Sequence, residues 1–108
     1  MSWDFGMEVD VGGKEPATLK YDRNYTYNVS PMFYEAMGGD GIASIEGKTG
    51  EEAAPLLSQA IKAMVEEPEK YKAMNPANGW GDYDGALELL RDLRSWGLES
   101  PLARYYIY

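Results

Sequence analysis

The first 29 residues alternate between apolar and polar side chains, and this two-residue period constrains the fold more than any other feature of the chain. Such a period is typical of β-strands with one buried face. The glycine- and proline-containing residues 12–16 separate two alternating runs, which together predict an antiparallel hairpin. Arg23 interrupts the second run and indicates an edge, a bulge or a frayed middle. The apolar faces comprise Trp3, Phe5, Met7, Val9 and Val11, then Ala17, Leu19, Tyr21, Tyr25, Tyr27 and Val29.

Two short helices are predicted in the next part of the chain. Ser30 before Pro31 predicts an N-cap with proline at the first helical position, and two glycines predict that this helix ends after residue 37. Residues 40–50 predict a loop with a single helical turn in it. A second short helix is predicted over residues 68–74, after a break at the preceding proline.

Two longer amphipathic helices are also predicted. Thr49 and Glu52 have the spacing of a capping box, and Asp82 is placed to cap a helix over residues 83–96. Gly97–Leu98 then predicts a Schellman ending, with the leucine folding back on the last turn. Each helix has one apolar stripe, formed by Ala53, Leu57, Ala60, Ile61 and Met64 in the first, and by Ala86, Leu89, Leu90, Leu93 and Trp96 in the second.

Residues 102–108 predict a final strand after Pro101. A chain of 108 residues is long enough to bury a core, and we expect residues 1–108 to form a single domain. The order of elements predicts an α+β fold. In this fold the N-terminal antiparallel β-hairpin and the C-terminal strand form a small sheet, with the two main helices packed on one face.

The composition excludes several kinds of chemistry. The chain has no Cys and no His, which removes thiol nucleophiles, disulfides, His-based catalysis and the usual zinc and haem ligands. We therefore expect a protein that is not an enzyme, with no catalytic residues, no metal and no cofactor. Ten basic residues against eighteen acidic ones give a net charge of −8, which argues against direct nucleic-acid binding. The acidity provides either solubility or a surface for a basic partner, including mimicry of a nucleic-acid backbone.

The sequence also contains no membrane signal. No stretch approaches the ~18 apolar residues that a membrane-spanning helix needs. The N-terminus has no basic segment followed by an apolar run. We expect a cytoplasmic protein without a membrane partner.

The segment over residues 75–85 is the first candidate site. In one interpretation, Trp80 and Tyr83 form an aromatic platform, with Asn78 and Asp82 as polar groups around it, for a small ligand or a partner's loop. In the other, Trp80 is an anchor in the core, Asp82 is a helix cap and the glycines are turn residues. The sequence leaves both interpretations open.

The last strand is the second candidate site. Its two faces both carry aromatic side chains, because Tyr106 and Tyr108 alternate with Tyr105 and Ile107. A sheet covered by helices on one side needs only one apolar face. The surplus predicts either a semi-exposed tyrosine patch or a surface for self-association or partner binding.

Two adjacent segments are similar to segments of known proteins. They are residues 78–85, with the sequence Asn-Gly-Trp-Gly-Asp-Tyr-Asp-Gly, and the following Leu87–Leu90. The chain resembles a group of small uncharacterised proteins encoded by bacteriophages and prophages. The similarity runs from residues 24–32, through the helix at 49–64, to the last helix. The resemblance implies a small accessory protein that acts in an infected bacterial cell by binding and blocking a host protein, including proteins of immune systems. It transfers no functional residues.

From the residues and the resemblance together, we expect a small, acidic, non-enzymatic accessory protein that binds another protein. A host bacterial protein is the expected partner, and a homo-oligomer is a further expectation. The expected binding residues are Asn78, Trp80, Asp82, Tyr83, Tyr106 and Tyr108. The alternative is a protein that binds or sequesters a nucleotide or metabolite through the loop over residues 78–83.

Overall fold

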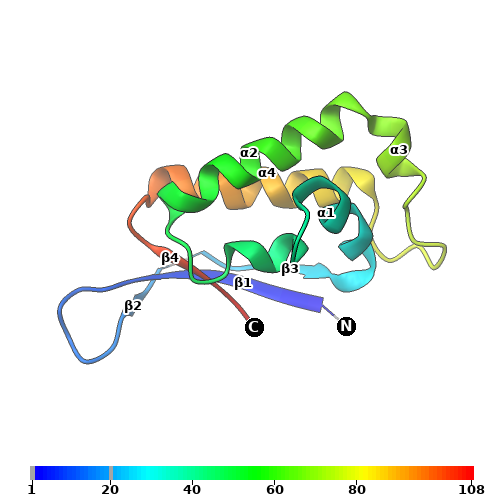
Figure 1. Cartoon of the computed structure of the whole chain (residues 1–108). Coiled ribbons are helices and arrows are strands. Elements are labelled where there is room, and N and C mark those ends of the chain that lie inside the picture. Colours follow the sequence, from blue (N-terminus) through cyan, green and yellow to red (C-terminus); the bar gives the residue numbers. More distant parts are fainter. Residues whose placement is uncertain (1, 20) are drawn as a thin grey trace.

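The computed structural model describes residues 2–19 and 21–108 and has the expected α+β architecture (Figure 1). Helices form one layer and an antiparallel sheet forms the other. In chain order the elements are β1 (Ser2–Val9), β2 (Ala17–Thr18), β3 (Arg23–Thr26), the 3₁₀ turn η1 (Tyr27–Val29), α1 (Ser30–Met37), the 3₁₀ turn η2 (Gly41–Ile45), α2 (Gly50–Glu66), α3 (Pro68–Lys72), α4 (Tyr83–Glu99) and β4 (Arg104–Ile107).

Strand β1 lies at the centre of the sheet. On one edge it pairs with β2 and β3, and on the other with β4, always antiparallel. Glu8 has a partner on each edge of β1, because it lies opposite Thr18 of β2 and opposite Arg104 of β4. The predicted sheet of the N-terminal hairpin and the C-terminal strand is therefore confirmed.

The second predicted strand is divided into β2 and β3, and the division falls next to Arg23, where the alternation indicated an interruption. Val9 pairs with Ala17, whereas Phe5 pairs with Arg23, so a step of four residues along β1 matches a step of six on the partner. The partner segment therefore contains two more residues than the stretch of β1 opposite it. Because two is an even number, the side chains of both pieces stay on their predicted faces.

Further differences lie where the sheet ends. Tyr27 and Val29 belong to η1 rather than to a strand. The hairpin extends past the helices, so Val11 is exposed rather than buried (Figure 1). Ser30 is the first residue of α1 and not its N-cap, because η1 runs directly into α1 and the Ser30 hydroxyl donates back to the Tyr27 carbonyl.

Helices α2 and α4 lie side by side and antiparallel over one face of the sheet, and α1 and η2 fill the remaining space (Figure 1). The predicted apolar stripes supply the core, with Trp96 half-buried against the Tyr21 ring at 5.0 Å between centroids. The other face of β1 is not covered by any described element (Figure 1). The largest fully buried side chains are Tyr71, Tyr105, Phe5, Phe33, Met7, Met32, Ile45, Leu57, Met64, Leu89, Leu90 and Leu93.

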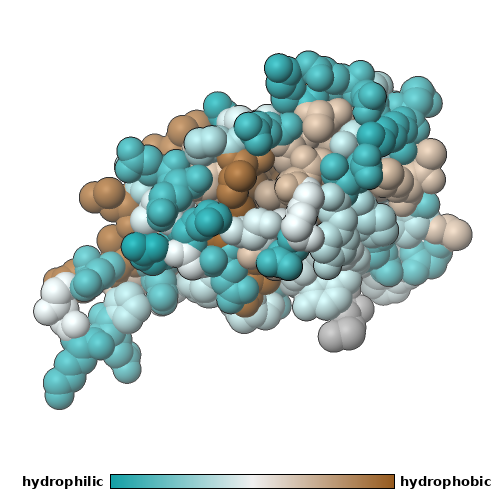
Figure 2. Space-filling model, in the orientation of Figure 1, coloured by the Kyte–Doolittle hydropathy of each residue, from teal (hydrophilic) through white to brown (hydrophobic). Residues whose placement is uncertain are grey.

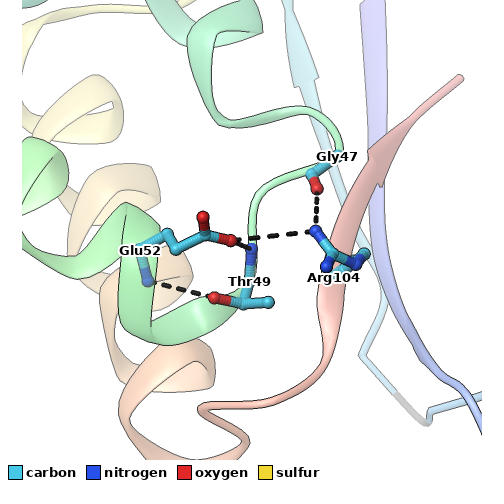
Figure 3. Close-up of polar contacts among 4 residues, drawn as sticks. All are labelled: Gly47, Thr49, Glu52 and Arg104. Atoms are coloured by element: carbon cyan, nitrogen blue, oxygen red, sulfur yellow. Dashed lines mark hydrogen bonds and ion pairs between the residues drawn. The ribbon is translucent and has the colours of Figure 1, made fainter.

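The capping box of α2 is present as predicted. The Glu52 amide donates to Thr49 Oγ1 at 3.1 Å, and the Thr49 amide donates to Glu52 Oε1 at 2.9 Å. Arg104 of β4 lies 3.7 Å from the same Glu52 oxygen and donates to the Gly47 carbonyl at 2.7 Å (Figure 3). The hydrogen bonds from Thr49, followed by the positive charge of Arg104, lower the pKa of the Glu52 carboxyl. This network joins the start of α2 to the last strand.

The predicted Schellman ending at Gly97 is wrong, because α4 continues to Glu99. Gly97 lies where the end of α4 crosses the start of α2. A Cβ added there would lie 2.5 Å from the Tyr105 hydroxyl and 3.0 Å from the Gly50 carbonyl oxygen. The glycine therefore serves the close approach of two helices rather than a helix cap, and Leu98 remains exposed on the helical surface.

Candidate interaction surfaces

The side chains of the 75–85 segment mostly hold its own backbone. Asn78 Oδ1 accepts from the Trp80 amide at 2.9 Å, and Asp82 Oδ1 accepts from the Gly85 amide at 2.7 Å as the N-cap of α4. Asn75 Oδ1 accepts from the Tyr83 amide at 2.8 Å. Asn78 and Asp82, the two polar groups expected around an aromatic platform, are therefore engaged in a turn and a helix cap.

The same segment is pressed against the sheet. The Tyr25 hydroxyl contacts the backbone of Asp82, accepting from its amide at 3.2 Å. A Cβ at Gly81 would lie 2.6 Å from a methyl carbon of Thr26, and one at Gly85 would lie 2.0 Å from the Tyr25 hydroxyl. Both glycines are therefore required for this close packing.

Trp80 lies at the surface with 68% of its area exposed, so the interpretation that placed it in the core was wrong. Tyr83 has the opposite position. It is buried at the start of α4 and belongs to the hydrophobic core cluster. The two aromatic residues of the predicted platform thus point to different environments, and only Trp80 is available to a partner.

The Tyr83 hydroxyl has a structural role at the end of α2. It donates to the Met64 carbonyl at 2.7 Å. Met64 lies near the C-terminus of α2, and the residue four positions later is Pro68, which has no N–H to offer that carbonyl. Tyr83 thereby supplies the hydrogen bond that the proline cannot make.

Replacing Tyr83 with phenylalanine is expected to lower the free energy of unfolding by about 1–3 kcal/mol, because it leaves a buried carbonyl without a donor. Urea denaturation checks this expectation. Tyr34→Phe, at an exposed tyrosine of α1, is the control and should leave the stability unchanged. Equal stability of Tyr83→Phe and wild type would show that the Met64 carbonyl does not depend on this hydroxyl.

Tyr106 and Tyr108 lie away from the 75–85 segment, on the uncovered face of the sheet. Their rings stack with 5.3 Å between centroids and 30° between planes. Tyr106 is partly buried and Tyr108 is 66% exposed, as expected for a semi-exposed tyrosine patch. Tyr105, on the opposite face, is buried and its hydroxyl donates to the Leu93 carbonyl.

The structure adds an apolar surface that the sequence did not predict. We call it the end surface and define it by Val9, Leu19, Leu98, Pro101 and Leu102, where the hairpin, the end of α4 and the turn before β4 meet. Leu98 and Leu102 expose 57% and 74% of their areas. Figure 2 shows apolar side chains gathered at this end of the molecule.

Two open hollows meet at the end surface, and both are lined by Pro101 and Leu102. The larger one, about 470 Å³, lies against the start of α2, where Ala54 and Pro55 complete its apolar lining. The smaller one, about 260 Å³, lies against the strands. The sequence did not indicate this surface, because Leu98 was assigned to a predicted helix ending and Leu102 to a predicted strand.

Carboxylates lie at the edges of the end surface. Glu51 lines the larger hollow. Glu99, at the end of α4, accepts a hydrogen bond from the Tyr21 hydroxyl at 3.3 Å. A third hollow of about 430 Å³ shares Leu102 and carries charges of both signs, from Glu8, Asp10, Lys14 and Arg104. The apolar centre is therefore bordered by charge, and most strongly by negative charge.

Within the described residues, no three carboxylates gather closely enough to hold a metal ion. Among the same residues, no helix has the length and apolar composition needed to cross a membrane. No protein-family model, no curated protein and no solved structure matches the chain.

Proposed function

We propose that this chain is a non-enzymatic protein-binding protein, and that its end surface holds an apolar segment of a partner, flanked by Lys or Arg. One observation carries the proposal: Leu98 and Leu102 stand exposed beside two adjoining apolar hollows. Contiguous apolar surface of this kind is typical of protein–protein contacts, whereas single exposed apolar side chains are common everywhere.

The charge distribution supports a basic partner. The chain carries a net charge of −8, and Glu51 and Glu99 lie at the border of the end surface. Apolar centres with a charged rim are the usual anatomy of protein interfaces, and complementary rims accelerate association and select the partner. A second copy of this acidic chain would bring like charges together, so another protein fits the surface better.

The resemblance to small phage and prophage proteins makes a host bacterial protein the first partner to test. In that setting the chain would act in the cytoplasm of the infected cell by occupying a surface of its target. The carboxylates at the starts of the helices support a non-enzymatic role, because Glu52 and Asp82 are engaged as caps. A ligand-binding role for the loop over residues 78–83 has less support, because Tyr83 is buried and Asn78 and Asp82 bind the local backbone.

Site-specific photo-crosslinking tests the proposal. A benzophenone side chain is placed at position 98, and in a matched control at Val65, an exposed apolar residue at the C-terminal end of α2. After irradiation in a bacterial host lysate, we expect position 98 to yield a specific crosslinked protein that position 65 does not. The crosslinked peptide should contain apolar residues with Lys or Arg beside them.

Three outcomes contradict the proposal. The same set of crosslinks from both positions indicates non-specific capture. A crosslink from position 98 to a second copy of this chain, together with a dimer mass in sedimentation, assigns the end surface to self-association. A crosslinked peptide rich in Asp and Glu overturns the stated partner chemistry.

A further inference from the structure

The uncovered sheet face carries an aromatic pair whose position is fixed by the strand beneath it. Tyr106 lies across Gly6 of β1, and a Cβ on Gly6 would lie 2.4 Å from both Cζ and the hydroxyl oxygen of Tyr106. The tip of the Tyr106 ring can approach β1 this closely because residue 6 is glycine. Tyr108 stacks on Tyr106 and is 66% exposed, so the pair presents the Tyr108 ring to solvent.

Carboxylates lie beside this pair. Asp4 and Tyr108 exchange two backbone hydrogen bonds of 2.9 Å, which brings their side chains to neighbouring places on one face. Asn24 Nδ2 donates to Asp4 Oδ1 at 3.0 Å and orients that carboxylate. Arg23 turns to the helical side, where its Nε donates to Asp92 Oδ2 at 3.0 Å, whereas the adjacent Asp22 is exposed.

The electrostatics of Tyr108 indicate how negative this neighbourhood is. Loss of hydration, then the charges of Asp22 and Asp4 with the neighbouring Tyr106, raise the pKa of the Tyr108 hydroxyl above its ordinary value. Each of these groups disfavours a further negative charge at this place. The two carboxylates, unlike the loss of hydration, favour a positive charge at this place.

We propose that the stacked pair Tyr106–Tyr108, together with Asp4 and Asp22, binds the guanidinium or ammonium group of a basic side chain on a partner protein. The electron-rich ring faces attract a cation, and nearby carboxylates supply hydrogen-bond acceptors for its N–H groups. The chain already shows this preference on its other side, where the Arg23 guanidinium lies 5.7 Å from the Tyr25 ring centroid.

This inference goes beyond the proposed function, because it names a second surface, a charged ligand group and the residues that recognise it. The end surface contains Leu98 and Leu102, and the cation surface contains none of its residues. The cation surface can be tested with a peptide alone. A negative result of the peptide titration does not contradict binding at the end surface. A negative result at the end surface likewise does not contradict the cation surface.

The probe is a tetra-arginine peptide with blocked ends, titrated at low salt into protein carrying ¹³C-labelled tyrosine rings. We expect saturable shifts of the Tyr106 and Tyr108 ring resonances. Tyr108→Leu should weaken binding about two- to five-fold, the range of an exposed cation–π contact, whereas Tyr108→Phe should bind as wild type does. Tyr108 is largely exposed, so neither change should disturb the fold, and a thermal melt confirms this.

Two controls separate this surface from general attraction to an acidic protein. A tetra-citrulline peptide has the same shape without the charge and should not shift the tyrosine resonances. Asp22→Asn should weaken binding more than Glu69→Gln, which removes the same charge from an exposed position of α3. Unchanged affinity of Tyr108→Leu, or equal weakening by Asp22→Asn and Glu69→Gln, would overturn the proposal.

Discussion

Replacing Gly50 with alanine is expected to lower the free energy of unfolding by about 2–3 kcal/mol, near the upper end of the overpacking range. The added Cβ would lie 2.5 Å from the Gly97 carbonyl oxygen, 2.6 Å from Gly97 Cα and 2.8 Å from the Ser100 carbonyl oxygen. All three are backbone atoms, so no side chain can rotate away and the α2–α4 crossing has to open. In an uncrowded helix the same change would stabilise the protein by roughly 0.5–1 kcal/mol.

Urea denaturation of Gly50→Ala checks this expectation, with Gly13→Ala as the matched control. Gly13 lies in the hairpin connection, and the nearest atom that its Cβ would meet is 3.9 Å away. The control should differ from wild type by no more than about 0.5 kcal/mol. A Gly50→Ala protein as stable as the control would mean that the two helices do not approach as closely as described.

A loss of about 2 kcal/mol of stability is expected between pH 10 and pH 12, with Tyr105 as the main source. Burial raises the pKa of the Tyr105 hydroxyl to about 12, against an ordinary value of 10.0. Between these values the unfolded chain loses the proton and the folded protein keeps it. The stability contributed by the neutral hydroxyl is therefore complete below pH 10 and is lost as the pH rises through the folded-state pKa.

Denaturation midpoints measured from pH 8 to pH 12 test this pH dependence. Tyr105→Phe should begin with lower stability, because it loses the hydrogen bond to the Leu93 carbonyl, but should decline less between pH 10 and 12. Burial also raises the pKa of Tyr71, so part of the decline should persist in the variant. Parallel curves for the two proteins would show that Tyr105 does not cause the alkaline loss.

Local patterns predicted the parts of the fold that local interactions determine. The Thr49–Glu52 capping box, the Asp82 cap and the alternation along β1 each depend on residues close together in sequence, and each is present. The two tyrosines expected to form a semi-exposed patch, Tyr106 and Tyr108, do so for a similar reason, because alternation places them on the face away from the core.

Contacts between distant residues explain the errors. Gly97 followed by a leucine has the local form of a helix ending. A glycine is needed there because the backbone of Gly50, 47 positions earlier in the chain, packs closely against it. Trp80 is apolar enough for a core, yet the close packing of Gly81 against Thr26 leaves its ring outside. Tyr83 is not available to the predicted site because it is buried and its hydroxyl donates to the Met64 carbonyl.

The end surface could not be predicted from the sequence, because it too depends on contacts between distant residues. Its residues come from β1, the hairpin, the end of α4 and the turn before β4, and no periodicity connects them. Each residue alone has an ordinary local explanation. Their exposure as one apolar surface emerges only when the tertiary structure brings them together.

The end surface is the proposed contact for an apolar segment of a partner protein. Its most direct test is the affinity of the crosslinked partner for three proteins, measured by calorimetry: wild type, the double variant Leu98→Asp/Leu102→Asp, and the control Val65→Asp. Because Leu98 and Leu102 are exposed, the double variant should fold normally. We expect its affinity to fall by at least about 30-fold, as for loss of an interface hot spot, and the control to bind as wild type does. Equal affinity of all three proteins would contradict the claim.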